Sequence, residues 1–179
     1  MRMRNVLILF IAIFATAVVA PIPANDDAVP FTSAELDKFL DDWPRFVRWA
    51  EERGREIGSI STPSEMMGAF ARFDAGSFLR DAGWDPDRFS YVAGHAWMAV
   101  IEITAREQLP GMIAGIDEAI ASLRANPRLT AEQRRTAIDE LTAAKALMLG
   151  LDAYFEVDPA EVELVRARQE LVRKVLRLD

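Results

Sequence analysis

Residues Trp84 to Gln108 read W-D-P-D-R-F-S-Y-V-A-G-H-A-W-M-A-V-I-E-I-T-A-R-E-Q, and the rest of the chain is best interpreted from this stretch. Asp85 is placed to cap a helix, and Pro86 suits the first helical position, where a missing N–H costs nothing. Apolar residues then fall on nearly every face, which is typical of a helix buried among other helices. They are Phe89, Val92, Ala93, Ala96, Trp97, Val100 and Ile103. We expect this segment to be the central helix of a small helical domain.

Signals for helix starts and stops divide the remaining sequence into further helices. Thr32–Glu35 and Thr62–Glu65 have the pattern of a capping box, Thr130 is placed to cap the helix that follows it, and Asp158–Glu161 combines a cap with proline at the first position. Leu109-Pro110-Gly111 is expected to break the central helix, and Pro44 is expected to kink or restart the helix that contains it. The other predicted helices cover 33–53, 63–73, a short segment between Asp74 and Gly83, 110–125, 130–149 and 159–178.

Several of these helices have apolar stripes at helical spacing. In the helix over 130–149, one stripe contains Ala137, Leu141, Ala144 and Met148. In the last helix, the predicted inward stripe contains Leu164, Ala167, Leu171, Val175 and Leu178, widened by Val165 and Val172. No stretch alternates with a period of two residues for long enough to predict a strand. The sequence therefore predicts an all-α fold, a single compact domain of five to six helices packed around the central apolar helix.

The N-terminal residues have the features of a signal peptide. Arg2 and Arg4 precede an unbroken apolar run over 6–15, and small residues follow it. The run is shorter than the roughly 20 residues that a spanning helix needs, so cleavage is favoured over an uncleaved membrane anchor. We expect a signal peptide over 1–24, cut between 17 and 24, a linker over 25–31 and a helical domain over 32–179. The expected location is the bacterial periplasm or the medium, with no stable membrane span after cleavage.

Composition narrows the class of function. Half of the 179 residues are apolar, which argues against disorder. Loss of Arg2 and Arg4 would move the formal net charge from −7 to −9, and such an acidic protein is unsuited to nucleic-acid binding. The chain has no cysteine, so disulfides cannot support the fold and the core must do so alone.

His95, the chain's single histidine, is the starting point for a candidate site. Tyr91, Met98 and Glu102 share its helix face, so one hypothesis is a ligand-binding pocket formed by these four residues. The alternative is a histidine packed at the edge of the core. Glu102 lies about 10.5 Å from His95 along the helix axis, too far for both to bind one ion. No metal or cofactor is expected.

Motifs for catalysis are missing from the sequence. It contains no G-x-S-x-G, Walker A, G-x-G-x-x-G or H-E-x-x-H pattern, and nothing places a serine beside His95. No set of residues assigns a nucleophile, a base and an oxyanion donor, so no catalytic residue is proposed. The sequence favours a non-enzymatic protein.

One short motif resembles a known family. Leu129-Thr130-Ala131-Glu132-Gln133 matches the L-T-x-x-Q motif of the Spy/CpxP-like periplasmic helical proteins, and a looser copy occupies 31–35. The resemblance implies an envelope-stress chaperone that shields unfolded polypeptide on a helical surface. The function expected from the sequence is therefore a binding or interaction role in the cell envelope, with envelope proteins or unfolded polypeptide as partners. The alternative is a small apolar-ligand-binding protein with a pocket beside the central helix.

Overall fold

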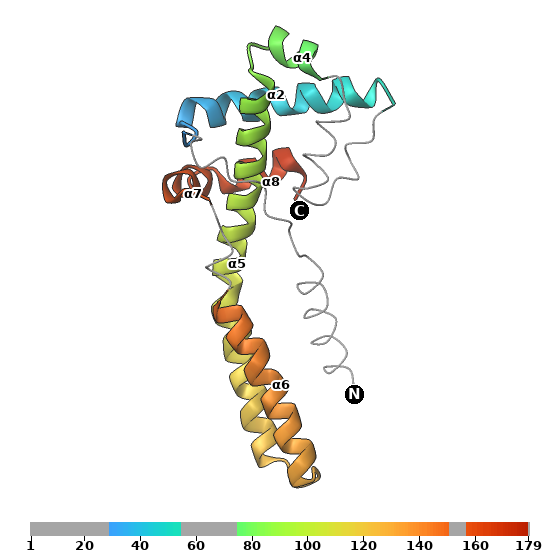
Figure 1. Ribbon diagram of the computed structural model, residues 1–179, viewed down its shortest axis with the longest axis vertical. Helices are drawn as coiled ribbons and strands as arrows, with labels where there is room; N and C mark the ends of the chain where they lie inside the picture. The colour runs from blue at the N-terminus through green and yellow to red at the C-terminus, as the bar shows by residue number, and fades with distance from the viewer. Residues whose placement is uncertain (1–28, 55–74, 151–156, 179) are drawn as a thin grey trace. The chain divides into compact units, whose positions relative to one another are not determined.

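The computed structural model describes residues 29–54, 75–150 and 157–178, and these residues form six α-helices and no strand (Figure 1). The predicted all-α class is confirmed. The helices are α2 (Ser33–Glu51), α4 (Gly76–Asp81), α5 (Pro86–Ala125), α6 (Ala131–Leu149), α7 (Pro159–Arg166) and α8 (Gln169–Leu176). The predicted signal peptide and the predicted helix over 63–73 lie outside the described residues. Within the described ranges, no helix combines the length and the apolar character needed to cross a membrane.

The described residues group into two compact units, a division that the sequence did not indicate. One unit, called the core unit here, contains residues 29–54, 75–104 and 157–178. The other contains residues 105–150 and is called the hairpin unit. The helix α5 begins in the first unit and ends in the second.

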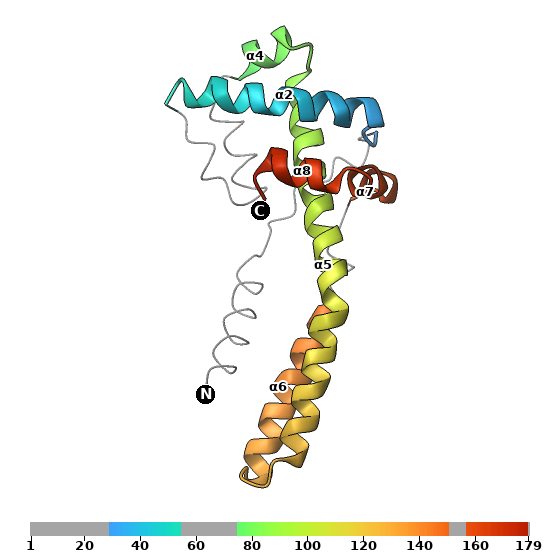
Figure 2. The same ribbon diagram turned by 180° about the vertical axis from the view of Figure 1, so that it is seen from behind.

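Aromatic side chains make the centre of the core unit, where α2 lies across the first turns of α5 (Figures 1 and 2). The ring of Phe89 is fully buried and is surrounded by four other rings. Their centroids lie at 5.5 Å for Phe39, 6.2 Å for Trp43, 5.6 Å for Phe46 and 5.3 Å for Trp84. Tilted, edge-on and stacked ring pairs of this kind contribute beyond the area that they bury.

The predicted burial of the central helix is confirmed for its apolar residues. Every apolar residue predicted to be inside is at most 3% exposed, including Phe89, Val92, Trp97 and Ile103. One face differs, because Tyr91, His95 and Met98 are only partly buried. This face is the one that carries the predicted site.

The helix starts follow the local signals in the sequence. Thr32 and Glu35 form a complete capping box at α2, and the side chain of Asp158 accepts a hydrogen bond from the backbone N–H of Ala160 at α7. Gly83 ends α4 with a φ of +74°, and the Trp84 N–H donates to the Leu79 carbonyl over 2.8 Å. This turn at the end of α4 places Trp84 in the aromatic core.

Proline ends neither of the two helices that contain it in their interior. The helix α2 runs through Pro44 without a restart, because buried residues on both sides of it, such as Trp43 and Phe46, continue one packed face. The predicted break at Leu109-Pro110-Gly111 is wrong, because α5 continues through Pro110 to Ala125. Pro110 and Arg106, one turn before it, are both exposed, so the backbone hydrogen bond that proline cannot make is lost on the solvent side of the helix.

The predicted single helix over 159–178 is also wrong, because it is divided into α7 and α8 around Arg168. Arg168 leaves the helical conformation and donates to Asp37 Oδ1 over 2.7 Å and to Ser33 Oγ over 2.7 Å, both on α2. The buried stripe therefore differs from the one predicted, since Leu171 is 49% exposed and Ala167 is exposed. Val165 and Val172 are buried as predicted, and Glu161, Val162 and Leu176 are buried with them.

The hairpin unit consists of the second part of α5 and the antiparallel α6, which lie side by side in both views (Figures 1 and 2). Thr130 and Gln133 form the capping box that starts α6, as predicted. Lys145 Nζ on α6 lies 2.6 Å from Asp117 Oδ1 on α5. Ile116 and Ile120 of α5 are buried, whereas α6 contains no buried residue. The residues of the predicted apolar stripe of α6 are only partly buried.

Candidate functional site

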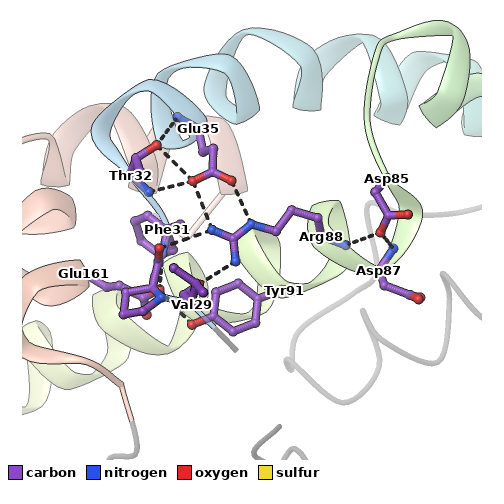
Figure 3. Close-up of polar contacts among 10 residues, drawn as sticks. Val29, Phe31, Thr32, Glu35, Asp85, Asp87, Arg88, Tyr91 and Glu161 are labelled. Carbon is purple, nitrogen blue, oxygen red and sulfur yellow. Dashed lines mark hydrogen bonds and ion pairs between the residues drawn. The ribbon is translucent and has the colours of Figure 1, made fainter. Parts of the chain in front are cut away.

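Glu161 on α7 is a fully buried carboxylate that joins three separate parts of the core unit. Its Oε1 accepts the backbone N–H of Phe31 over 2.7 Å and the hydroxyl of Tyr91 over 2.9 Å (Figure 3). Its Oε2 lies 2.7 Å from Nδ1 of His95. Because a buried carboxylate is stable only when its oxygens are paired, these three donors keep Glu161 inside the fold.

Tyr91 acts as a donor to this carboxylate. Burial raises the pKa of the Tyr91 hydroxyl well above its ordinary value, and the hydrogen bond to Glu161 raises it further. The phenol therefore keeps its proton. The Tyr91 ring also stacks on the His95 ring with centroids 3.9 Å apart, and the Arg88 guanidinium lies 4.8 Å from the Tyr91 ring centroid. The three side chains form a column along α5.

Glu161 orients the His95 ring through its contact with Nδ1. An ionised carboxylate can only accept a hydrogen bond, so Nδ1 of His95 carries the proton that points to Glu161. In the neutral ring the other nitrogen, Nε2, is then an acceptor. The His95 side chain is 22% exposed, whereas that of Glu161 is 0% exposed. The pair thus places a fixed imidazole at the boundary between the core and solvent.

A second polar cluster holds the segment before α2 against α5. Arg88 Nε and Nη2 donate to the two carboxylate oxygens of Glu35 over 2.7 and 3.0 Å, a bidentate arrangement (Figure 3). Arg88 also donates to the carbonyls of Val29 over 2.6 Å and Pro30 over 3.2 Å. Together with the Phe31–Glu161 bond, these contacts fix residues 29–32.

The Glu35–Arg88 pair predicts a specific acid sensitivity. The hydrogen bond from Arg88, with smaller contributions from Thr32, outweighs burial and lowers the pKa of Glu35 from 4.5 to about 2. A carboxyl whose pKa is lower in the folded state stabilises the fold above its unfolded pKa, and this contribution is lost as the pH falls from about 4.5 toward 2. We expect Glu35→Gln to lower the free energy of unfolding by about 1 kcal/mol at pH 7, because the pair is partly exposed, and to have little effect near pH 2.

Urea denaturation of both proteins across this pH range measures the difference. Glu163→Gln, which changes an exposed carboxylate of α7, is the matched control. Its effect on the free energy of unfolding should be smaller and should not disappear as the pH falls toward 2. A Glu35→Gln penalty that stays constant down to pH 2 would contradict the assignment.

Of the four residues predicted to form the site, the structure brings Tyr91 and His95 together at Glu161. Met98 is partly buried one turn further along α5, and Glu102 is 4% exposed, two turns from His95. Glu161 was recognised in the sequence only as an acid near a helix start. Its position four residues before Val165, on the inward face of α7, is the signal that would have identified it as buried.

No group of three or more histidine or acidic side chains that could hold a metal ion occurs in the described ranges. Comparisons with protein-family models, curated proteins and solved structures find no match for this chain. Its function therefore has to be inferred from its residues and their geometry.

Proposed function

We propose that the protein is a non-enzymatic interaction protein of the bacterial cell envelope that shields unfolded polypeptide, and that α6 of the hairpin unit is its binding element. The observation that carries this proposal is the exposure of α6. None of its 19 residues is buried, and Leu147 and Leu149 are 72% and 59% exposed. Helices in water are normally stabilised by burying an apolar face, so these leucines suit contact with another apolar chain.

The charge pattern of α6 supports a polypeptide with apolar side chains as the partner. Between Leu141 and Gly150, Lys145 is the one charged residue. Its charge is balanced by Asp117, to which it is bonded within the hairpin unit. The end of α6 therefore presents exposed apolar groups with no uncompensated charge. Such a surface would accept apolar segments of different sequence, and Met148 beside it can adapt its shape to them.

The motif that resembles the Spy/CpxP-like proteins lies in the same unit. Leu129 to Gln133 form the turn before α6 and its first residues, where Thr130 and Gln133 exchange capping hydrogen bonds. These contacts give the motif a structural role at the start of α6. The resemblance supports a chaperone-like role for the hairpin unit.

The proposal is tested by suppression of aggregation. Purified protein should reduce light scattering by reduced, unfolded α-lactalbumin more than an inert acidic protein does. A variant with both Leu147→Gln and Leu149→Gln should lose at least about half of this effect, because it replaces the exposed apolar groups with polar ones. Leu171→Gln is the matched control, since Leu171 is an exposed leucine on α8 of the core unit.

Two results would overturn the proposal in different ways. Equal scattering with the protein and with the inert acidic protein would refute shielding. Full activity of the double variant would refute the role of α6. Equal loss in the double variant and in Leu171→Gln would show that any exposed leucine serves, which would also remove the assignment to α6.

A further inference from the structure

The turn that joins α5 and α6 carries a local excess of positive charge on a protein that is acidic as a whole (Figure 1). Residues 124–135 contain four arginines and one acid, Glu132, so their formal net charge is +3, whereas that of the whole chain is −7. We call this segment the arginine tip. Its arginines are Arg124, Arg128, Arg134 and Arg135.

One arginine of the tip holds the turn in place, and the other three are exposed to solvent. Arg134 Nη2 donates to the backbone carbonyls of Asn126 over 3.0 Å and of Leu129 over 3.2 Å. The exposed arginines are Arg124, Arg128 and Arg135. Because the backbone of the turn is already fixed, a partner that binds these three side chains does not have to order it first.

The acidic residues of the hairpin unit compensate this charge only weakly. Arg135 Nε lies 3.9 Å from Asp139 Oδ2, but the two side chains are 86% and 71% exposed, so water screens their attraction. Glu118, the acid of α5 nearest in sequence to Arg124, lies about 9 Å from it along the helix axis, and the Debye length at physiological salt is about 8 Å. The arginine tip therefore keeps a positive potential.

The distribution of the exposed arginines favours a surface with many phosphates over a single bound ion. They come from the last turn of α5, from the connecting turn and from the first part of α6. A guanidinium binds a phosphate through two parallel hydrogen bonds, so each of these side chains suits its own phosphate group. Since the N-terminal residues predict export, the phosphate-bearing surface that the protein would meet is a membrane.

We propose that the arginine tip docks the hairpin unit on an anionic phospholipid surface, with Arg124, Arg128 and Arg135 binding lipid phosphates. The attraction of an anionic leaflet falls off within about a Debye length, so only residues next to the lipid contribute to it. An acidic protein can therefore bind through a small basic segment. This docking is peripheral, and it does not depend on the exposed leucines that shield polypeptide.

Sedimentation of the purified protein with lipid vesicles tests this docking. The protein should bind vesicles of phosphatidylglycerol and phosphatidylcholine, should bind pure phosphatidylcholine vesicles at least about tenfold more weakly, and should be released by added salt. The triple variant Arg124→Gln/Arg128→Gln/Arg135→Gln should bind the anionic vesicles at least about tenfold more weakly, because each basic residue near such a surface contributes about fivefold. It keeps Arg134, so the turn retains its hydrogen bonds, and unchanged circular dichroism confirms the fold.

The matched control is a second triple variant, Arg48→Gln/Arg80→Gln/Arg166→Gln. It removes three exposed arginines of the core unit and so changes the net charge by the same amount. This control should bind the anionic vesicles like the original protein. Equal losses in the two triple variants would show that net charge alone matters and would overturn the role of the tip.

Two further measurements decide between the lipid surface and other partners. Equal binding to anionic and neutral vesicles would refute docking through lipid charge. Tighter binding of the original protein to a short DNA duplex than to the anionic vesicles would assign the tip to nucleic acid and overturn the lipid assignment. The Leu147→Gln/Leu149→Gln variant should keep its vesicle binding, and its loss there would transfer the binding from the tip to the exposed leucines.

Discussion

Replacing Glu161 with leucine should lower the free energy of unfolding by about 3–5 kcal/mol, as expected when one partner of a buried polar network is removed. The substitution keeps an apolar side chain of similar size, so the loss comes from the polar groups that remain. The backbone N–H of Phe31, the hydroxyl of Tyr91 and Nδ1 of His95 would all lose their acceptor. Urea denaturation followed by tryptophan fluorescence measures the effect, because Trp43, Trp49, Trp84 and Trp97 all belong to the core unit.

Glu163→Leu is the matched control for this substitution. Glu163 lies two residues further along α7, but its side chain is 66% exposed and its ion pair with Arg166 is on the surface. Surface pairs of this kind contribute little, so a change of less than about 1 kcal/mol is expected. Equal effects at Glu161 and Glu163 would mean that the buried carboxylate does not hold the core unit together.

The features predicted well from the sequence are those that depend on neighbouring residues. Capping needs only a side chain and a backbone group three positions away, so Thr32 and Thr130 could be assigned from the sequence alone. The burial of the central helix was equally visible, because apolar residues on nearly every face leave no side that favours water. Both predictions use information contained within one segment.

The errors arose where packing outweighed a local rule. Proline disfavours a helix by removing one hydrogen bond, yet α5 continues through Pro110 because the packed face resumes at Ile116 and Ile120. The reverse holds at Arg168, where a sequence suited to one helix is divided by contacts with Ser33 and Asp37 on α2. Neither outcome can be derived from the segment itself, since the partners are distant in the chain.

The candidate site shows the same limit. Tyr91 and His95 could be paired from their spacing on one helix, and the structure stacks their rings. Glu161 could not be paired with them, because it lies 66 residues beyond His95 in the sequence. Its spacing from Val165, which was predicted to be inside, places Glu161 on the inward face of α7, but its partners Phe31, Tyr91 and His95 could not be identified from that segment alone.

Replacing Phe89 with alanine should also destabilise the core unit strongly, by about 3–5 kcal/mol, the usual cost of a large buried aromatic side chain. Phe89 is fully buried, and rings from α2 and from the residue Trp84 surround it on several sides. These neighbours are held by their own contacts, so they cannot collapse into the space and a cavity should remain. Trp84, whose ring centroid is 5.3 Å from that of Phe89, reports the change directly in fluorescence.

Leu171→Ala provides the comparison, because it also shortens an apolar side chain but at a position that is 49% exposed. Its cost should be below about 1 kcal/mol, since little additional area becomes exposed to water. Both variants are compared with the original protein by urea denaturation at one pH. If Phe89→Ala unfolds at the same urea concentration as Leu171→Ala, the aromatic cluster is not the stabilising centre of the core unit. In that case the orientation of α5, which places Tyr91 and His95 beside Glu161, must be maintained by the polar contacts of Glu161 and Arg88 instead.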